Sequence, residues 1–84
     1  MKISPEYWED VRTRKKTFEV RRNDRDFKLG DSLILRCHSK DDAGALVEDR
    51  SRDNWPYDLR RLVTYILPGG QFGIDPDYVV LGII

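Results

Sequence analysis

The sequence has 84 residues, about half the usual size of a domain, and predicts a single domain over residues 1–84. Fifteen Lys and Arg residues balance fifteen Asp and Glu residues, so the net charge does not indicate a bulk nucleic-acid binder. One cysteine and one histidine exclude an internal disulfide framework, a cysteine-rich zinc site and an enzyme built on several histidines.

Other classes of protein are disfavoured by what the sequence lacks. No apolar run approaches the ~20 residues of a membrane span, and the polar N-terminus has no signal-peptide core. We therefore expect a cytoplasmic protein with no membrane partner. No motif indicates a metal or a cofactor, so none is predicted, and a monomer is the default expectation.

The first predicted element is a helix over residues 5–13. Ser4 is a suitable N-cap, and Pro5 fits the first helical position, where no amide hydrogen is needed. An apolar stripe at three- and four-residue spacing follows, made of Tyr7, Trp8 and Val11.

Strand patterns occupy most of the remaining sequence. They predict strands at 17–22, 32–37, 60–67 and 78–84. The last of these is almost entirely apolar, which predicts a central strand buried on both faces. The polar segment 39–54 predicts a long loop or irregular excursion with room for a short strand, and is a candidate lid.

This order of one helix and four or five strands predicts an α+β protein that is mainly β. The arrangement that fits best is a small β-barrel of about five strands, mixed or antiparallel, with the N-terminal helix capping one opening.

The charge is unevenly distributed along the chain. Residues 12–28 carry eight basic and three acidic side chains, a local excess of five positive charges. Such an excess can attract an anionic ligand to a neutral protein. It can equally be a solvated strand surface that keeps the protein soluble.

The densest group of chemically useful side chains lies in and before the first strand after the helix. On a strand, Thr17, Glu19 and Arg21 share one face, with Lys16 just before them, and Phe18 and Val20 share the other face. Arg21 could bind a phosphate or a base edge, Glu19 could accept a hydrogen bond from an amine, and Lys16 would add positive potential. Alternatives from the same residues are acid–base chemistry and exposed cross-strand ion pairs.

Two further groups of residues indicate structure rather than chemistry. Cys37 and His38 are adjacent and point to opposite faces of a strand, which predicts a core thiol and a surface imidazole. The acidic residues Asp24, Asp26 and Asp31 lack the spacing of a calcium-binding loop and are interpreted as turn residues.

Four ordered motifs resemble a known family. They are PEYW (5–8), KKTFEVRRNDRDFKLGD (15–31), TYILPGGQFGI (64–74) and YVVLGI (78–83). Together they resemble the small stand-alone bacterial and phage proteins of the ASCH (activating signal cointegrator homology) branch of the PUA-like superfamily. The resemblance covers nearly the whole chain except residues 39–60, and implies a PUA-like β-barrel capped by an N-terminal helix.

The resemblance also implies a function. ASCH domains are regarded as RNA-binding or nucleotide-handling modules with a Lys–Thr–x–x–x–Arg motif in their cleft, which Lys16, Thr17 and Arg21 match. Some small members are amidohydrolases that deacylate acetylated cytidine with a Lys, a nucleophilic Thr, an Arg and a downstream Glu. Lys16 and Arg21 match two of these residues, whereas Glu19 stands at the nucleophile position.

The function predicted from the sequence is therefore an RNA- or nucleotide-binding module with a cleft of Lys16, Thr17, Glu19 and Arg21. Its rim is predicted to consist of Asn23, Asp24 and Arg25. The alternative is an amidohydrolase of an acylated cytidine nucleoside that uses Lys16, Glu19 and Arg21. A third possibility is a protein-interaction module that uses the 39–57 loop, which contains the aromatic sequence WPY at 55–57.

Overall fold

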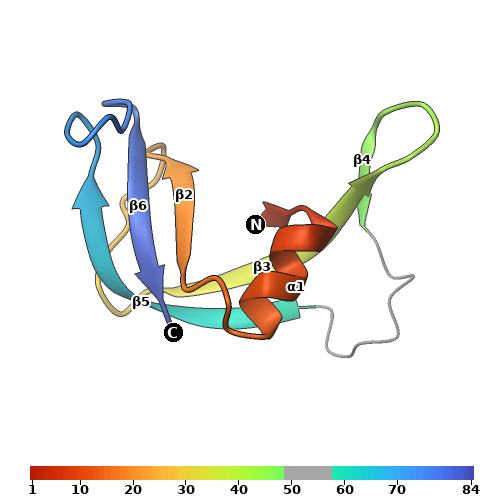
Figure 1. Ribbon diagram of the computed structural model, residues 1–84, viewed down its shortest axis with the longest axis horizontal. Helices are drawn as coiled ribbons and strands as arrows, with labels where there is room; N and C mark the ends of the chain where they lie inside the picture. The colour runs from red at the N-terminus through yellow and green to blue at the C-terminus, as the bar shows by residue number, and fades with distance from the viewer. Residues whose placement is uncertain (49–57) are drawn as a thin grey trace. The chain divides into compact units, whose positions relative to one another are not determined.

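The computed structural model of the protein describes residues 1–48 and 58–84, which contain one helix and six strands (Figure 1). The elements in chain order are β1 (Lys2–Ile3), α1 (Pro5–Arg12), β2 (Phe18–Arg22), β3 (Ser32–Lys40), β4 (Leu46–Glu48), β5 (Asp58–Pro68) and β6 (Tyr78–Ile83). The predicted fold class, α+β and mainly β, is confirmed. Over the described ranges, α1 is too short and too polar to cross a membrane.

Hydrogen bonds connect the strands in the order β1-β3-β5-β6-β2, and β4 pairs with β3. β1 and β3 are parallel, whereas the pairs β2–β6, β3–β4 and β5–β6 are antiparallel. Of the two predicted strand arrangements, mixed or antiparallel, the structure thus has the mixed one. The chain forms two compact units. The first consists of Met1–Lys16 and Leu33–Arg60, and the second of Thr17–Ser32 and Arg61–Ile84.

Helix α1 of the first unit begins where the sequence predicts. Ser4 has the extended backbone of an N-cap, Pro5 is the first helical residue, and the Trp8 amide donates to the Ser4 carbonyl at 2.8 Å. The Ser4 hydroxyl does not cap the helix. Among the described residues, its oxygen is the one buried side-chain polar atom without a hydrogen-bond partner.

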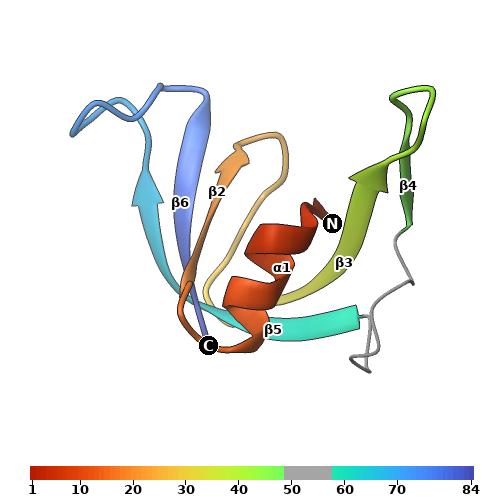
Figure 2. The same ribbon diagram turned by 45° about the vertical axis from the view of Figure 1, so that its right-hand side comes forward.

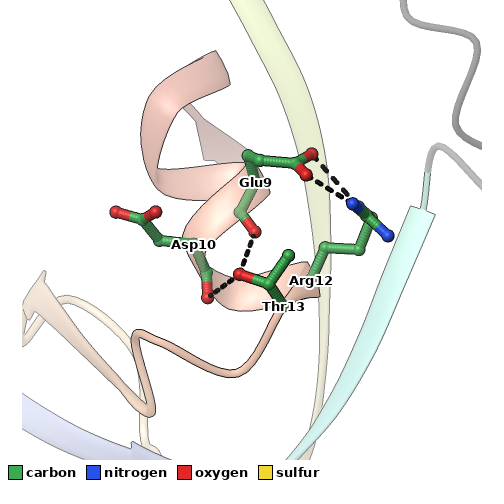
Figure 3. Close-up of polar contacts among 4 residues, drawn as sticks. All are labelled: Glu9, Asp10, Arg12 and Thr13. Atoms are coloured by element: carbon green, nitrogen blue, oxygen red, sulfur yellow. Dashed lines mark hydrogen bonds and ion pairs between the residues drawn. The ribbon is translucent and has the colours of Figure 1, made fainter.

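The last turn of α1 is held by side chains (Figure 3). The Thr13 hydroxyl donates to the carbonyls of Glu9 (3.0 Å) and Asp10 (3.4 Å), which also accept from the backbone amides of Thr13 and Lys16 (3.0 Å each). The Arg12 guanidinium donates to both carboxylate oxygens of Glu9. The hydrogen bond that Arg12 donates to the Glu9 carboxylate raises the pKa of Arg12, and the guanidinium charge lies at the C-terminal end of the helix dipole, where a cation is favoured.

The core of the first unit combines two of the three apolar residues of the helix stripe, Trp8 and Val11, with one face of β3. Trp8 is completely buried, and Val11 one turn further on is 1% exposed. The other buried side chains of this unit are Ile3, Leu33, Leu35, Cys37 and Leu59. Cys37 is therefore a core thiol as predicted, while His38 is half-buried and its Nδ1 lies 2.9 Å from the Arg36 carbonyl oxygen.

A hairpin connects β3 and β4 within the predicted 39–54 loop. The Asp41 carboxylate accepts from the amides of Ala43 (3.0 Å) and Ala45 (2.9 Å), a local bonding pattern that favours a turn. The short strand predicted in this loop is confirmed as β4. The remainder of the loop, the residues 55–57 and the lid interpretation lie outside the described residues.

The second unit contains a three-stranded antiparallel arrangement in which β6 lies between β5 and β2 (Figure 2). Every second residue of β6 is buried, namely Val79, Leu81 and Ile83, and Val63 of β5 pairs with Ile83 on the same face. The central position predicted for β6 is confirmed. The prediction that both of its faces are buried is wrong, because Tyr78 is exposed and Val80 is half-buried on the opposite face.

Gly69, at the β5 end of the β5–β6 connection, is required by a close approach of backbone. A Cβ built on Gly69 would lie 2.1 Å from the Asp75 carbonyl oxygen and 2.2 Å from that of Tyr78. Both atoms belong to the backbone and cannot rotate away. The Gly69→Ala variant is therefore expected to unfold at lower urea concentration, with a loss of about 1–3 kcal/mol or more.

The matched control for this prediction is Gly70→Ala. A Cβ on Gly70 has 4.0 Å of space, and only the φ of +82° penalises alanine, by about 1–2 kcal/mol. Urea unfolding followed by circular dichroism compares the two variants. A smaller loss for Gly69→Ala than for Gly70→Ala would contradict the close approach.

Candidate ligand-binding site on strand β2

The centre of the candidate site is an ion pair between Glu19 and Arg21 on one face of β2. Arg21 Nε donates to Glu19 Oε2 at 3.1 Å, and Arg21 Nη2 lies 2.9 Å from the same oxygen. The two residues are two positions apart on a strand, so their side chains emerge on the same side. The structure thus confirms that Glu19 and Arg21 share a face.

The two partners differ in accessibility. The Glu19 side chain is 4% exposed, whereas the Arg21 side chain is 23% exposed. Over residues 1–48 and 58–84, Glu19 is the one buried residue with a charged side chain. A buried carboxylate is costly unless a cation and hydrogen bonds compensate it, and Arg21 provides that cation.

This arrangement fixes the orientation of the Arg21 guanidinium. Only two of its five N–H donors are needed for the contacts with Glu19, which leaves donors for a further acceptor. A fixed, partly exposed guanidinium is suited to phosphate oxygens or to the acceptor edge of a base. Glu19 itself acts here as the group that positions Arg21.

The burial of β2 is the reverse of what its apolar residues suggest. Glu19 is 3% exposed, whereas Phe18 and Val20 are 45% and 51% exposed. The register explains this result, since Glu19 pairs with Leu81 and Arg21 with Val79, both buried residues of β6. The Glu19–Arg21 pair therefore lies on the buried face of the β2–β6 ladder, a feature that the sequence of β2 alone does not reveal.

The remaining predicted residues of the second unit lie at the two ends of β2. Thr17 is exposed just before the strand, and its carbonyl accepts from the Ile83 amide at 2.9 Å. Asn23, Asp24 and Arg25 follow the strand and are exposed, while their place at the rim of a cleft remains a prediction from the sequence. The Asn23 amide donates to the Asp77 carbonyl at 2.7 Å and thereby fixes the start of this segment.

Lys16 belongs to the first unit, in which it contacts α1. Its amide donates to the Asp10 carbonyl at 3.0 Å, and its ammonium lies 5.3 Å from the centre of the Tyr7 ring. This distance is typical of a cation–π interaction. The side chain is half-buried, and a place for Lys16 beside Glu19 remains a prediction from the sequence.

Two of the three acidic residues interpreted as turn residues make local contacts with Lys28. Asp31 Oδ2 accepts from the Lys28 amide at 2.8 Å, and Asp26 lies 3.4 Å from the Lys28 ammonium in solvent. Within the described parts of the chain, no group of three or more His, Cys, Asp or Glu side chains is arranged to hold a metal ion.

Together, the fold and the site define a small, mainly β protein with a buried carboxylate that orients a partly exposed arginine. Residues 1–83 match the model of a family described as a domain of unknown function, DUF3850, and the chain belongs to this family. No curated protein matches the chain.

Proposed function

We propose that this protein binds RNA or a nucleotide-like ligand, with Arg21 as the contacting residue and Glu19 as the residue that positions it. The observation that carries the proposal is the ion pair on β2, in which a buried carboxylate holds a guanidinium that is 23% exposed. The resemblance of residues 15–31 to ASCH proteins supports the same ligand class.

The basic residues that flank Arg21 in the sequence are compatible with an anionic ligand. Arg25 lies exposed in the turn that follows β2, and Lys16 precedes the strand by two residues in the sequence. Three such cations contacting a single strand predict a shallow salt dependence, with a log–log slope of about −2. Asn23 and Asp24 in the same turn could supply hydrogen bonds at the rim.

Binding is favoured over the alternative hydrolysis of acylated cytidine. That reaction would require Glu19 to attack an acyl carbon, but its carboxylate is buried and Oε2 accepts two contacts from Arg21. A carboxylate in such a pair is poorly accessible and weakly nucleophilic. The same geometry suits a role in orientation.

The experiment compares the conservative variants Arg21→Lys and Arg22→Lys in titrations with short single-stranded RNAs at two salt concentrations. Both variants keep the charge, but the residues are neighbours on opposite faces of β2. We expect Arg21→Lys to weaken binding by about 1–3 kcal/mol because the planar fork is lost. Arg22→Lys should bind like the wild type.

Circular dichroism shows whether both variants are folded before they are titrated. Equal losses of RNA affinity in the two variants would mean that the face on which the arginine lies does not matter, which would contradict the proposed role of Arg21. Absence of binding by the folded wild type at low salt would exclude RNA as the ligand.

A further inference from the structure

The second unit has a sheet face that is apolar although it is exposed. Cross-strand partners of an antiparallel sheet point to the same side, so the register identifies the residues opposite Glu19 and Arg21. They are Phe18, Val20 and Arg22 of β2, Tyr78, Val80 and Gly82 of β6, and Tyr65 and Leu67 of β5. These eight residues are called the apolar face, and the three strands that carry it lie side by side in Figures 1 and 2.

The large side chains of this face reach solvent. Phe18, Val20, Tyr65 and Tyr78 are each at least 38% exposed, and Tyr65 reaches 64%. Leu62 and Ile84 continue the face, since they are exposed and exchange both backbone hydrogen bonds with each other. An antiparallel sheet with one buried face normally carries polar residues on the other face, whereas here Arg22 is the one charged member of the apolar face.

We propose that the apolar face is the interface through which two copies of this chain form a symmetric dimer. Its four large exposed apolar side chains, together with Leu62 and Ile84, present about 100 Å² each, or about 600 Å² in all. A stable protein–protein interface buries about 800 Å² on each partner. The residues at the rim of the sheet therefore need to contribute only about 200 Å² of additional buried surface. Two sheets packed face to face form the usual layer of a β-sandwich.

The shape of the apolar face, with projecting side chains beside a glycine, suits contact with the same face of a second copy. Phe18, Gly82 and Tyr65 lie opposite one another on three neighbouring strands, so a row of two exposed aromatic residues has a glycine between them. A Cβ on Gly82 would lie 3.0 Å from the Tyr65 Cβ, so the middle of this row remains without a side chain. A two-fold interface needs projecting and low positions on the same patch, which this row provides.

The charges favour a second copy over the other possible occupants. The net charge of the chain is zero, so two copies do not repel each other at long range. RNA affinity depends mainly on cations near phosphates, and the apolar face offers Arg22 alone. Aromatic residues with an arginine at the edge are typical of the core and rim of protein interfaces.

The test is sedimentation velocity of the full chain over a wide concentration range. We expect a mass of twice 9.9 kDa at high concentration and a reversible shift toward 9.9 kDa on dilution. Val20→Lys and Tyr65→Lys each place two like charges in the interface, because a two-fold axis repeats the substitution. Each variant should weaken the dimer by about a hundredfold or more.

The matched control is Phe72→Lys, which introduces the same charge at an aromatic residue that is 84% exposed and lies in the turn between β5 and β6. It should dimerise like the wild type. A wild type that stays monomeric at all concentrations would overturn the proposal, as would a dimer that persists in both face variants. A monomer whose RNA binding is lost in Tyr65→Ala would overturn it too and assign the face to base stacking, independently of the result for Arg21.

Discussion

Replacing Trp8 with alanine is expected to lower the free energy of unfolding by about 3–5 kcal/mol, the cost of removing a large aromatic side chain from a core. Trp8 has no solvent exposure and lies in α1 next to the buried Val11 on the helix stripe. A domain of this size has a total stability near the lower end of about 5–15 kcal/mol. The variant should therefore be largely unfolded or close to its unfolding midpoint at room temperature.

The neighbouring aromatic residue provides the control. Tyr7 is 49% exposed, and its ring is 5.3 Å from the Lys16 ammonium, so Tyr7→Ala should cost about 1 kcal/mol. Urea unfolding followed by far-ultraviolet circular dichroism measures both variants. Similar losses for Trp8→Ala and Tyr7→Ala would show that α1 does not pack on the core through Trp8.

The second large effect is expected at the Glu19–Arg21 pair. Arg21→Met keeps an apolar stem of similar length but removes the cation from a carboxylate that is 4% exposed. Removing one partner of a buried ion pair costs about 3–5 kcal/mol, and the partial exposure of Arg21 places this case near 3 kcal/mol. Chemical unfolding at neutral pH measures the loss.

A double-mutant cycle separates the ion pair from general packing. Glu19→Met together with Arg21→Met replaces both charges by apolar side chains, and such a replacement is often close to neutral. We expect the double variant to be more stable than Arg21→Met alone, with a coupling energy of about 1–3 kcal/mol. Strictly additive losses would mean that the two side chains do not stabilise each other.

The elements that could be predicted from the sequence are those with strong local signals. The apolar stripe of α1, with proline at its first position, gave the helix to within one residue. The β-branched runs before Pro68 and at the end of the chain gave β5 and β6. β1 was missed because its two residues are too short to show any periodicity, and it exists through parallel pairing with β3.

The orientation of β2 could not be predicted, because a strand pattern does not state which of its two faces is buried. The apolar side chains of Phe18 and Val20 suggest that their face is buried. The pairing of Glu19 with the buried Leu81 shows that the opposite face, which carries Glu19, is the buried one. A buried Glu19 becomes acceptable only because Arg21 lies two residues later on the same face. The strand pattern thus predicted correctly that Glu19 and Arg21 share a face, while their burial and the apolar face follow from the register with β6.

The central claim is that Arg21, held by Glu19, contacts the ligand. The most direct measurement is a titration of ¹⁵N-labelled protein with short single-stranded RNA, in which the Nε–Hε signals of the arginine side chains are followed by nuclear magnetic resonance. We predict that the Arg21 signal shifts on binding, while the signal of Arg22 on the opposite face of β2 does not. RNA binding that shifts Arg22 and leaves Arg21 unchanged would contradict the claim.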